Sequence, residues 1–356
     1  NIVMGTAETL YPTVESDGSF TINIPLYHHT QVRMMIGNAD LVILLSPEKE
    51  TNVAINLSNP PGKQFVFSGQ YATINNEWCQ PELITKIPPV YSDGDLLDSI
   101  VGISANEFKK RCINQYKRYV THNNAQLQFS EDTRTLANLS CAFDCLENLQ
   151  ATHYCLQTAY QKKENITREQ AFAAFLDVYL PDDFHNYLKD FPVNHPLALY
   201  CYNYRNVVMD LYDTHKDPLA YEKNLLKNAP LTKEEQTLIH QYETAFKAGI
   251  SFQQESELMA LSAKYFKEND LFRWESFSKA KERLSNIIQD STSLIVDYIR
   301  AIYMRSSFYN LQPLTPRQEL MASEITNPIF LGIIQDMNRQ MQPRQKTITK
   351  KFTICE

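Results

Sequence analysis

Seven cysteines are the side chains of this 356-residue sequence that could most readily do chemistry. They are Cys79, Cys112, Cys141, Cys145, Cys155, Cys201 and Cys355. A thiolate can attack a disulfide or bind a metal, but an odd count without even spacing does not indicate a scaffold stapled by disulfides. The cysteine count therefore leaves the redox compartment open.

The segment Trp78-Cys79-Gln80-Pro81-Glu82 is close to W-C-x-P-C, the active-site motif of thioredoxins. Glu82 stands where the second thiol would be, so disulfide exchange has no resolving cysteine here. A redox cysteine is also activated at the start of a helix, whereas a polar Asn75-Asn76-Glu77 precedes this one. We interpret the motif as a chance similarity.

Cys141 and Cys145 are four residues apart on a predicted helix, with Cys155 further along. Four-residue spacing places both thiols on one face, where they could form half of a metal site or a redox sensor. Zinc needs four ligands and no C-x₂-C partner is present, while a disulfide at this spacing would strain a helix. Small buried side chains are the interpretation that we favour.

Two histidines could act with a nucleophile or a carboxylate, and a third group, His28-His29, could bind a metal weakly if exposed. His153 is two residues from Cys155, and His185 follows Asp182-Asp183. Spacing alone cannot show that such groups converge, and helix capping after Pro181 accounts for the two aspartates. His28-His29 is expected at the surface beside a strand end. The sequence thus predicts no catalytic, metal or cofactor-binding residue; Cys79, Cys141, Cys145, His153, Cys155 and His185 remain the candidates.

Composition and motifs exclude several classes of protein. A hydrophobic fraction of 43% is too high for a disordered chain. No apolar run approaches the roughly 18 residues of a membrane span. A pI near 5.7 without a dominant basic block argues against a nucleic-acid partner. Neither G-x-G-x-x-G nor G-x-x-x-x-G-K-[ST] occurs, so a phosphate-cradling loop is not indicated.

Glycine and charge divide the chain into two regions. Seven of the 9 glycines lie within the first 102 residues, and residues 1–100 contain 4 Lys/Arg against 11 Asp/Glu, which is the whole net charge of −7. Glycine is useful in turns and costly inside helices. We therefore predict a β-rich domain over 1–75, a transition over 76–100, a helical domain over 101–342 and a polar connector over 343–356.

Alternating apolar residues and turn signals predict about six short strands before residue 70. Asp17-Gly18 and Gly37-Asn38-Ala39-Asp40 are turn signals. The predicted strands include 20–24, 32–36, 41–45, 53–57 and 64–67. This spacing favours a small antiparallel sandwich.

Beyond Gly102 the apolar period is helical. Leu136, Leu139, Phe143, Leu146 and Leu149 share one face, and capping residues predict helices after Thr167, Thr232, Thr315 and Asn327. Tyrosines at helical spacing could form a ligand platform, but packing between helices is the interpretation we favour. The fold class is therefore α+β, with a small β-sandwich-like domain followed by a larger all-α domain of helical hairpins.

The order of elements in the first 75 residues, and one late helix, resemble a known family. Asp17-Gly18 before the strand 20–24, Leu44-Leu45-Ser46-Pro47 before an alternating strand, and Phe67-Ser68-Gly69 before Ile74-Asn75 carry the resemblance, together with the late helix at Ile325-Thr326-Asn327-Pro328. The pattern is similar to the N-terminal, non-thioredoxin region of large envelope thiol-disulfide oxidoreductases of the TlpA/ResA type. The family often has Pro-Gly where this chain has Pro47-Glu48.

The resemblance implies that a C-terminal thioredoxin domain is missing, since no C-x-x-C occurs. It implies a non-catalytic accessory region in the periplasm or envelope of a Gram-negative bacterium, with a protein partner or its own thioredoxin domain as the binding partner and a lipid anchor possible upstream. A free-standing envelope protein that binds a peptide or glycan is the alternative.

Overall fold

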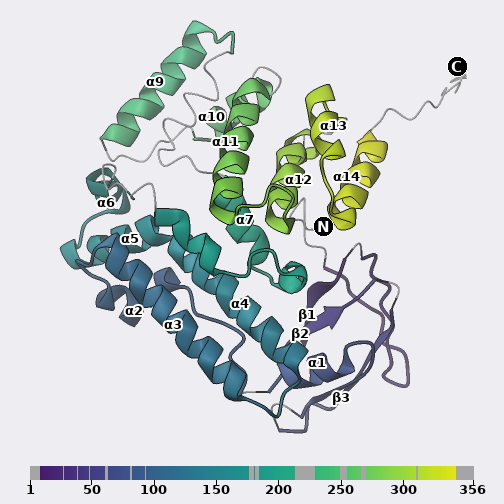
Figure 1. Cartoon of the computed structure of the whole chain (residues 1–356). Coiled ribbons are helices and arrows are strands. Elements are labelled where there is room, and N and C mark those ends of the chain that lie inside the picture. Colours follow the sequence, from purple (N-terminus) through teal and green to yellow (C-terminus); the bar gives the residue numbers. More distant parts are fainter. Residues whose placement is uncertain are drawn as a thin grey trace, which may run out of the picture.

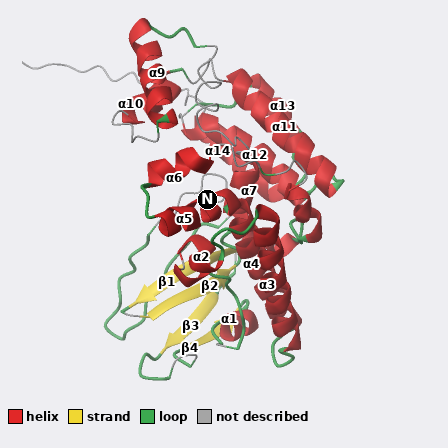
Figure 2. Ribbon diagram, turned by 90° about the vertical axis from the view of Figure 1, so that its left-hand side faces the viewer, coloured by secondary structure: helices red, strands yellow, loops and turns green. Residues whose placement is uncertain are grey.

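The computed structural model describes residues 9–26, 28–37, 39–47, 49–60, 63–80, 82–92, 94–175, 180, 184–212, 229–248, 255–265, 270–309 and 312–341. The fold is α+β: two small antiparallel sheets come first and a mostly helical region follows (Figures 1 and 2). The predicted fold class is therefore confirmed.

The sheets are two hairpins. Strand β1 (Thr30–Ile36) pairs with β2 (Ala39–Leu45), and β3 (Thr51–Ile55) pairs with β4 (Phe65–Gly69). The first hairpin pairs Ile36 with Ala39, and Gly37 in its turn has φ +58, where a side chain would be strained. A turn therefore lies between these strands, but it is shorter than the turn predicted over residues 37–40, since Ala39 and Asp40 already belong to β2.

The predicted strand over residues 20–24 is wrong. Its turn forms, with Gly18 N–H donating to Glu15 O at 2.9 Å, and the following side chains alternate between half-buried and exposed. Within the described part of the chain, however, no strand pairs with this segment. Alternation of apolar and polar residues indicates which side of an extended segment is buried. A strand also needs a neighbouring strand to bond its backbone N–H and C=O groups.

Helix α1 (Ala72–Trp78) joins both sheets to the helices through three consecutive side chains. The Asn75 amide accepts from Leu44 N (2.8 Å) and donates to Leu44 O (3.1 Å), and Asn76 does the same with Phe67 (2.9 and 3.1 Å). The Glu77 carboxylate accepts from Ser130 Oγ at 2.7 Å. Each asparagine therefore supplies the two hydrogen bonds that a neighbouring strand would have made.

The helical region contains α2 (Gly94–Ser99), α3 (Ala105–Ala125), α4 (Glu131–Gln150), α5 (Thr152–Glu164), α6 (Arg168–Phe175), α7 (Tyr204–Tyr212), α9 (Lys233–Lys247), α10 (Glu255–Lys264), α11 (Asp270–Ile288), α12 (Leu294–Tyr309), α13 (Pro316–Ser323) and α14 (Pro328–Met341). Short 3₁₀ helices are η1 (Val90–Ser92), η2 (Phe184–Asp190) and η3 (Pro196–Tyr200). Within the described residues no helix is both long and apolar enough to cross a membrane.

Capping side chains start the helices where the sequence predicts. Thr167, Thr232 and Thr315 each accept a hydrogen bond from a backbone N–H three residues later. Asn327 Oδ1 accepts from Ile329 N at 3.0 Å, before the proline that begins α14. These bonds satisfy N–H groups that lack a partner in the first helical turn.

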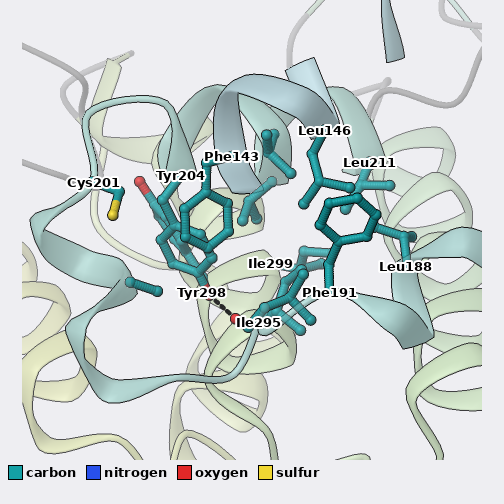
Figure 3. Packing of buried hydrophobic residues seen from close by; sticks show 14 of the residues in the cluster. Phe143, Leu146, Leu188, Phe191, Cys201, Tyr204, Leu211, Ile295, Tyr298 and Ile299 are labelled. Carbon is teal, nitrogen blue, oxygen red and sulfur yellow. Dashed lines mark hydrogen bonds between the residues drawn. The ribbon is translucent and has the colours of Figure 1, made fainter. Parts of the chain in front are cut away.

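Helix α4 is the centre of the main core. The predicted face of Leu136, Leu139, Phe143, Leu146 and Leu149 is buried. Phe143 meets Tyr204 edge-on with 4.8 Å between ring centroids, and Tyr298 stacks on Phe330 at 4.8 Å. Figure 3 shows Phe143, Tyr204 and Tyr298 grouped on one side of this core and Leu146, Leu188 and Phe191 on the other. Phe143, Tyr204 and Tyr298 pack between helices, as expected, whereas Tyr154 of α5 is 45% exposed.

The proline-rich segment Ile84–Val90 crosses α3 and α4 in extended form, and side chains hold its backbone. The Asn123 amide pairs with both N (3.0 Å) and O (2.9 Å) of Ile84. Asp144 accepts from Ile87 N at 2.6 Å, and Asn148 accepts from Val90 N at 2.9 Å. The transition from sheets to helices is therefore a fixed part of the core and not a loose linker.

Candidate functional site

The structure places Cys79 at the wrong end of a helix for thiol chemistry. It is the C-cap of α1, half-buried, and its Sγ donates to Asn75 O at 3.5 Å. The negative end of the helix dipole disfavours a thiolate, and burial raises the pKa of Cys79. The W-C-x-P-E segment therefore does not reproduce the activated cysteine of a thioredoxin.

Cys141 and Cys145 lie in the interior of α4, both buried. Cys141 Sγ donates to Ile84 O at 3.2 Å, and Cys155 is buried in α5. Burial raises the pKa of Cys141 and of Cys155 to about 12, and it raises that of Cys145 as well. These thiols are protonated near neutral pH, so they act as small apolar side chains. Cys355 lies outside the described residues.

His153 and Cys155 do not converge. Both are in the first turn of α5, where residues two apart point in different directions, and Cys155 is buried while His153 is half-buried. His185 lies in η2, where its Nδ1 is 3.4 Å from Tyr187 Oη and its ring meets Phe184 edge-on. Asp182 and Asp183 lie outside the described residues, and among those described no group of three His, Cys, Asp or Glu side chains could hold a metal ion.

The expectation that His28 and His29 lie at the surface is wrong. His28 is buried, and His29 is half-buried with its ring stacked on Tyr200 of η3 at a centroid distance of 5.0 Å. Tyr71 meets the same ring edge-on, and the Tyr71 Oη is 3.2 Å from His29 Nδ1. A helix from residues 196–200 covers this end of β1, which no local pattern in residues 28–36 could show.

A groove between α2 and α3 is the described feature best suited to binding. Its cavity has a volume of about 680 Å³, within the range of ligand sites. The floor is apolar and is formed by Val90, Leu96, Ile100, Phe108 and Cys112. The remaining lining residues are polar or positively charged: Ser99, Arg111, Asn114, Gln115, Lys117 and Arg118.

Local sequence explains why α3 presents this surface. Ser104 and Glu107 form a capping box that starts the helix. Phe108 and Cys112 are one turn apart and face the core, while Arg111 and Arg118 are two turns apart on an exposed face. Arg111 Nη1 donates to Ser99 O at 2.6 Å, at the end of α2. This bond fixes the width of the groove at that point.

The rim of the groove carries only positive charge. In the part of the chain that the structure describes, no carboxylate lies within ion-pair distance of Arg111, Lys117 or Arg118. The nearby acids have other partners: Asp98 Oδ1 is 2.7 Å from Lys162 Nζ, and Glu107 accepts from Ser104 N at 2.9 Å. The groove therefore offers an apolar floor beside cations that no described carboxylate pairs with, of which Arg111 also donates to Ser99 O.

Charge summed over long regions of the sequence does not reveal this site. Residues 101–356 are neutral overall, yet α3 has five Lys or Arg residues and one acid, Glu107. The signal that could have revealed it is the repeat of Lys110-Arg111 as Lys117-Arg118, seven residues later, on a predicted helix. Seven residues are nearly two helical turns, so each pair returns to the same face.

Comparison of the chain with protein-family models, with curated proteins and with solved structures finds no match.

Proposed function

We propose that this chain is a non-catalytic, partner-binding region of an envelope thiol-disulfide oxidoreductase, and that the α2–α3 groove is where the partner binds. The groove carries the proposal, because it combines an apolar floor with unpaired cations at its rim. The order of N-terminal elements, which resembles that of TlpA/ResA-type proteins, supports the placement in this class and in the cell envelope.

The state of the thiols favours binding over electron transfer. A thiol attacks a disulfide as its thiolate, and burial raises the pKa of each described cysteine. In this proposal a thioredoxin module encoded in the same protein does the redox chemistry. The present chain selects or positions the partner.

The way α1 and the 84–90 segment are held supports a role as a rigid platform. Asn75, Asn76 and Glu77 bind both sheets and the start of α4, and Asn123, Asp144 and Asn148 bind the segment that leads to α2. A preformed groove loses less entropy when a partner binds than a flexible one does.

Disulfide-reductase assays on the whole chain test this proposal. We expect no reduction of insulin by the chain with dithiothreitol above the dithiothreitol background, while thioredoxin as a positive control is active. Turnover that disappears in the Cys79→Ser variant would contradict the non-catalytic assignment. The coding sequence that follows Glu356 is expected to encode W-C-x-x-C.

A free-standing envelope protein that binds a glycan is the second candidate, and Tyr154 is the observation that favours it. Tyr154 is 45% exposed and meets Tyr91 with 5.8 Å between ring centroids. Exposed aromatic rings can stack on sugars. A thermal-shift screen with glycans tests this candidate: a shift that Tyr154→Ala removes would favour it over the oxidoreductase assignment.

A further inference from the structure

We propose that the occupant of the α2–α3 groove is an acidic, amphipathic segment of a partner protein. This inference rests on the proposed function and names the chemistry of its partner. Three features of the groove lead to it: the spacing of its cations, the nature of its floor and the anchoring of its walls.

The cations are spread along the groove. Arg111 and Arg118 are seven residues apart on α3, which is about 10.5 Å along the helix axis, and Lys117 adjoins the second of them. A single anionic headgroup would meet only one end of this row. Several carboxylates distributed along a peptide match it, and a guanidinium can bind a carboxylate through two parallel hydrogen bonds.

The floor selects for apolar side chains between those carboxylates. Leu96 is the partly exposed apolar side chain of this floor, while Ile100 and Phe108 also line the cavity but are only 4% and 1% exposed. Helices that bind in grooves commonly insert apolar residues from one face and keep polar residues on the other. Leu96 is half-buried, so an incoming leucine or isoleucine can cover it and remove apolar surface from water.

Both walls are anchored before any partner arrives. Arg111 binds the last carbonyl of α2, Ser99 O, and Lys162 Nζ binds the first, Gly94 O, at 3.2 Å. Lys162 also pairs with Asp98. The short helix α2 is therefore held at both ends, and its Leu96 lines the groove.

Nucleic acid and anionic lipid are the rival occupants. The phosphates of nucleic acid would use the cations but leave the apolar floor uncovered, and a single lipid headgroup would leave one end of the cation row unused. A peptide with both carboxylates and apolar side chains uses the floor and the whole row, which is why we assign the groove to it.

Fluorescence polarisation with the whole chain tests the assignment. The probe is a labelled peptide of Glu and Leu arranged as an amphipathic helix; a peptide of the same composition in scrambled order and a Lys/Leu peptide are the controls. We expect binding of the helical Glu/Leu peptide that weakens as salt increases. Equal binding of the scrambled peptide would overturn the assignment.

Charge reversal locates the binding. We expect R111E/R118E to bind the probe about tenfold more weakly or worse, equivalent to at least about 1.4 kcal/mol. The matched control K163E/K233E makes the same change in net charge at exposed lysines of α5 and α9 and should stay within about twofold, because distant exposed charges are screened. Equal losses in both variants would overturn a specific rim.

Two further variants keep the test decisive. R111Q/R118Q replaces the charge reversal if circular dichroism shows that R111E/R118E is unfolded, and L96Q should weaken binding without changing the net charge.

Displacement of the probe by anionic phospholipid vesicles or by a DNA oligonucleotide at lower concentration than by unlabelled peptide would assign the groove to that rival. Absence of probe binding without insulin turnover overturns only this inference, whereas insulin turnover overturns the proposed function.

Discussion

The buried and the exposed side chains of α3 differ in whether they can react with or bind a partner. Cys112 and Asn123 are buried, Cys112 at the floor of the groove, whereas Arg111, Lys117 and Arg118 are exposed at its rim. Burial raises the pKa of Cys112 to about 12, so its nucleophilic form, the thiolate, is scarce near neutral pH. The rim cations are exposed to water.

This difference shows that the environment of a side chain, and not its residue type alone, decides whether it can react or bind. The buried polar groups stabilise the fold through hydrogen bonds, as the Asn123 side chain does with the backbone N and O of Ile84. Lys117 and Arg118 make no ion pair among the described residues and remain available to a partner, whereas Arg111 also anchors α2 through a backbone carbonyl. Substitutions of the buried side chains should therefore change stability, and those of the exposed cations should change binding.

The largest expected effect is that of Asn123→Ala. It removes the partner of a backbone N–H and a backbone C=O at Ile84, and unsatisfied buried groups cost about 1–3 kcal/mol each. We expect a loss of about 3 kcal/mol in the free energy of unfolding, measured with urea. Asn106→Ala, at an exposed position of the same helix, is the control and should change it by less than about 0.5 kcal/mol. Similar values for both variants would refute the structural role of the buried side chains.

The next effect depends on pH and on Asp144. Burial raises the pKa of this carboxyl from 3.8 to about 6, although Ile87 N and Asn203 Nδ2 donate to it. As pH rises the unfolded chain releases this proton first, so ionisation lowers stability between about pH 4 and 6, by about 3 kcal/mol.

Urea unfolding at both ends of that pH range measures the effect. The wild type should lose stability relative to Asp144→Asn as the pH rises, because asparagine does not ionise. Asp132→Asn, at an exposed position in the first turn of α4, should show no such trend. A constant difference between wild type and Asp144→Asn would contradict the raised pKa.

A smaller effect concerns thiol access. Of the cysteines that the structure describes, iodoacetamide should modify the half-buried Cys79 first, and it should reach the buried Cys112, Cys141, Cys145, Cys155 and Cys201 only through opening of the core. Mass spectrometry over time checks this order. Rapid labelling of Cys145 in the native protein would show that the core around it is more open than its burial indicates.

The smallest effect on stability is that of Arg118→Ala, within about 0.5 kcal/mol, since its charge is exposed and no described carboxylate pairs with it. The same variant should weaken binding of the Glu/Leu probe. Thermal unfolding and fluorescence polarisation on one preparation separate the two quantities. A large loss of stability with unchanged binding would reverse the roles that we assign to the buried and the exposed side chains of α3.

Much of the fold could be predicted because its signals are local. The turn at Gly37, the caps at Thr232 and Thr315, and the buried face that includes Phe143 each depend on neighbours within a few residues. The strand predicted over residues 20–24 is absent because alternation of apolar and polar residues does not supply a strand to pair with. The prediction that His29 lies at the surface failed because Tyr200, far along the chain in η3, stacks on its ring.

The candidate site could be predicted only in part. A helical reading of Lys110-Arg111 and Lys117-Arg118 would have placed four cations on neighbouring faces of α3, but the floor of the groove comes from α2 and from Val90 as well. Periodicity in one helix cannot show which other element packs beside it. The groove exists because two helices are held at a particular distance.

Glycine content, charge and apolar period suffice to assign a turn-rich acidic region followed by a helical one, since each is a property of nearby residues. Other features depend on packing between residues far apart in the chain. These are the burial of the thiols and of the histidines, and the position of the groove where cations lie beside apolar side chains. Burial and proximity set the pKa of a group and its access to a partner, and both arise only when the elements assemble.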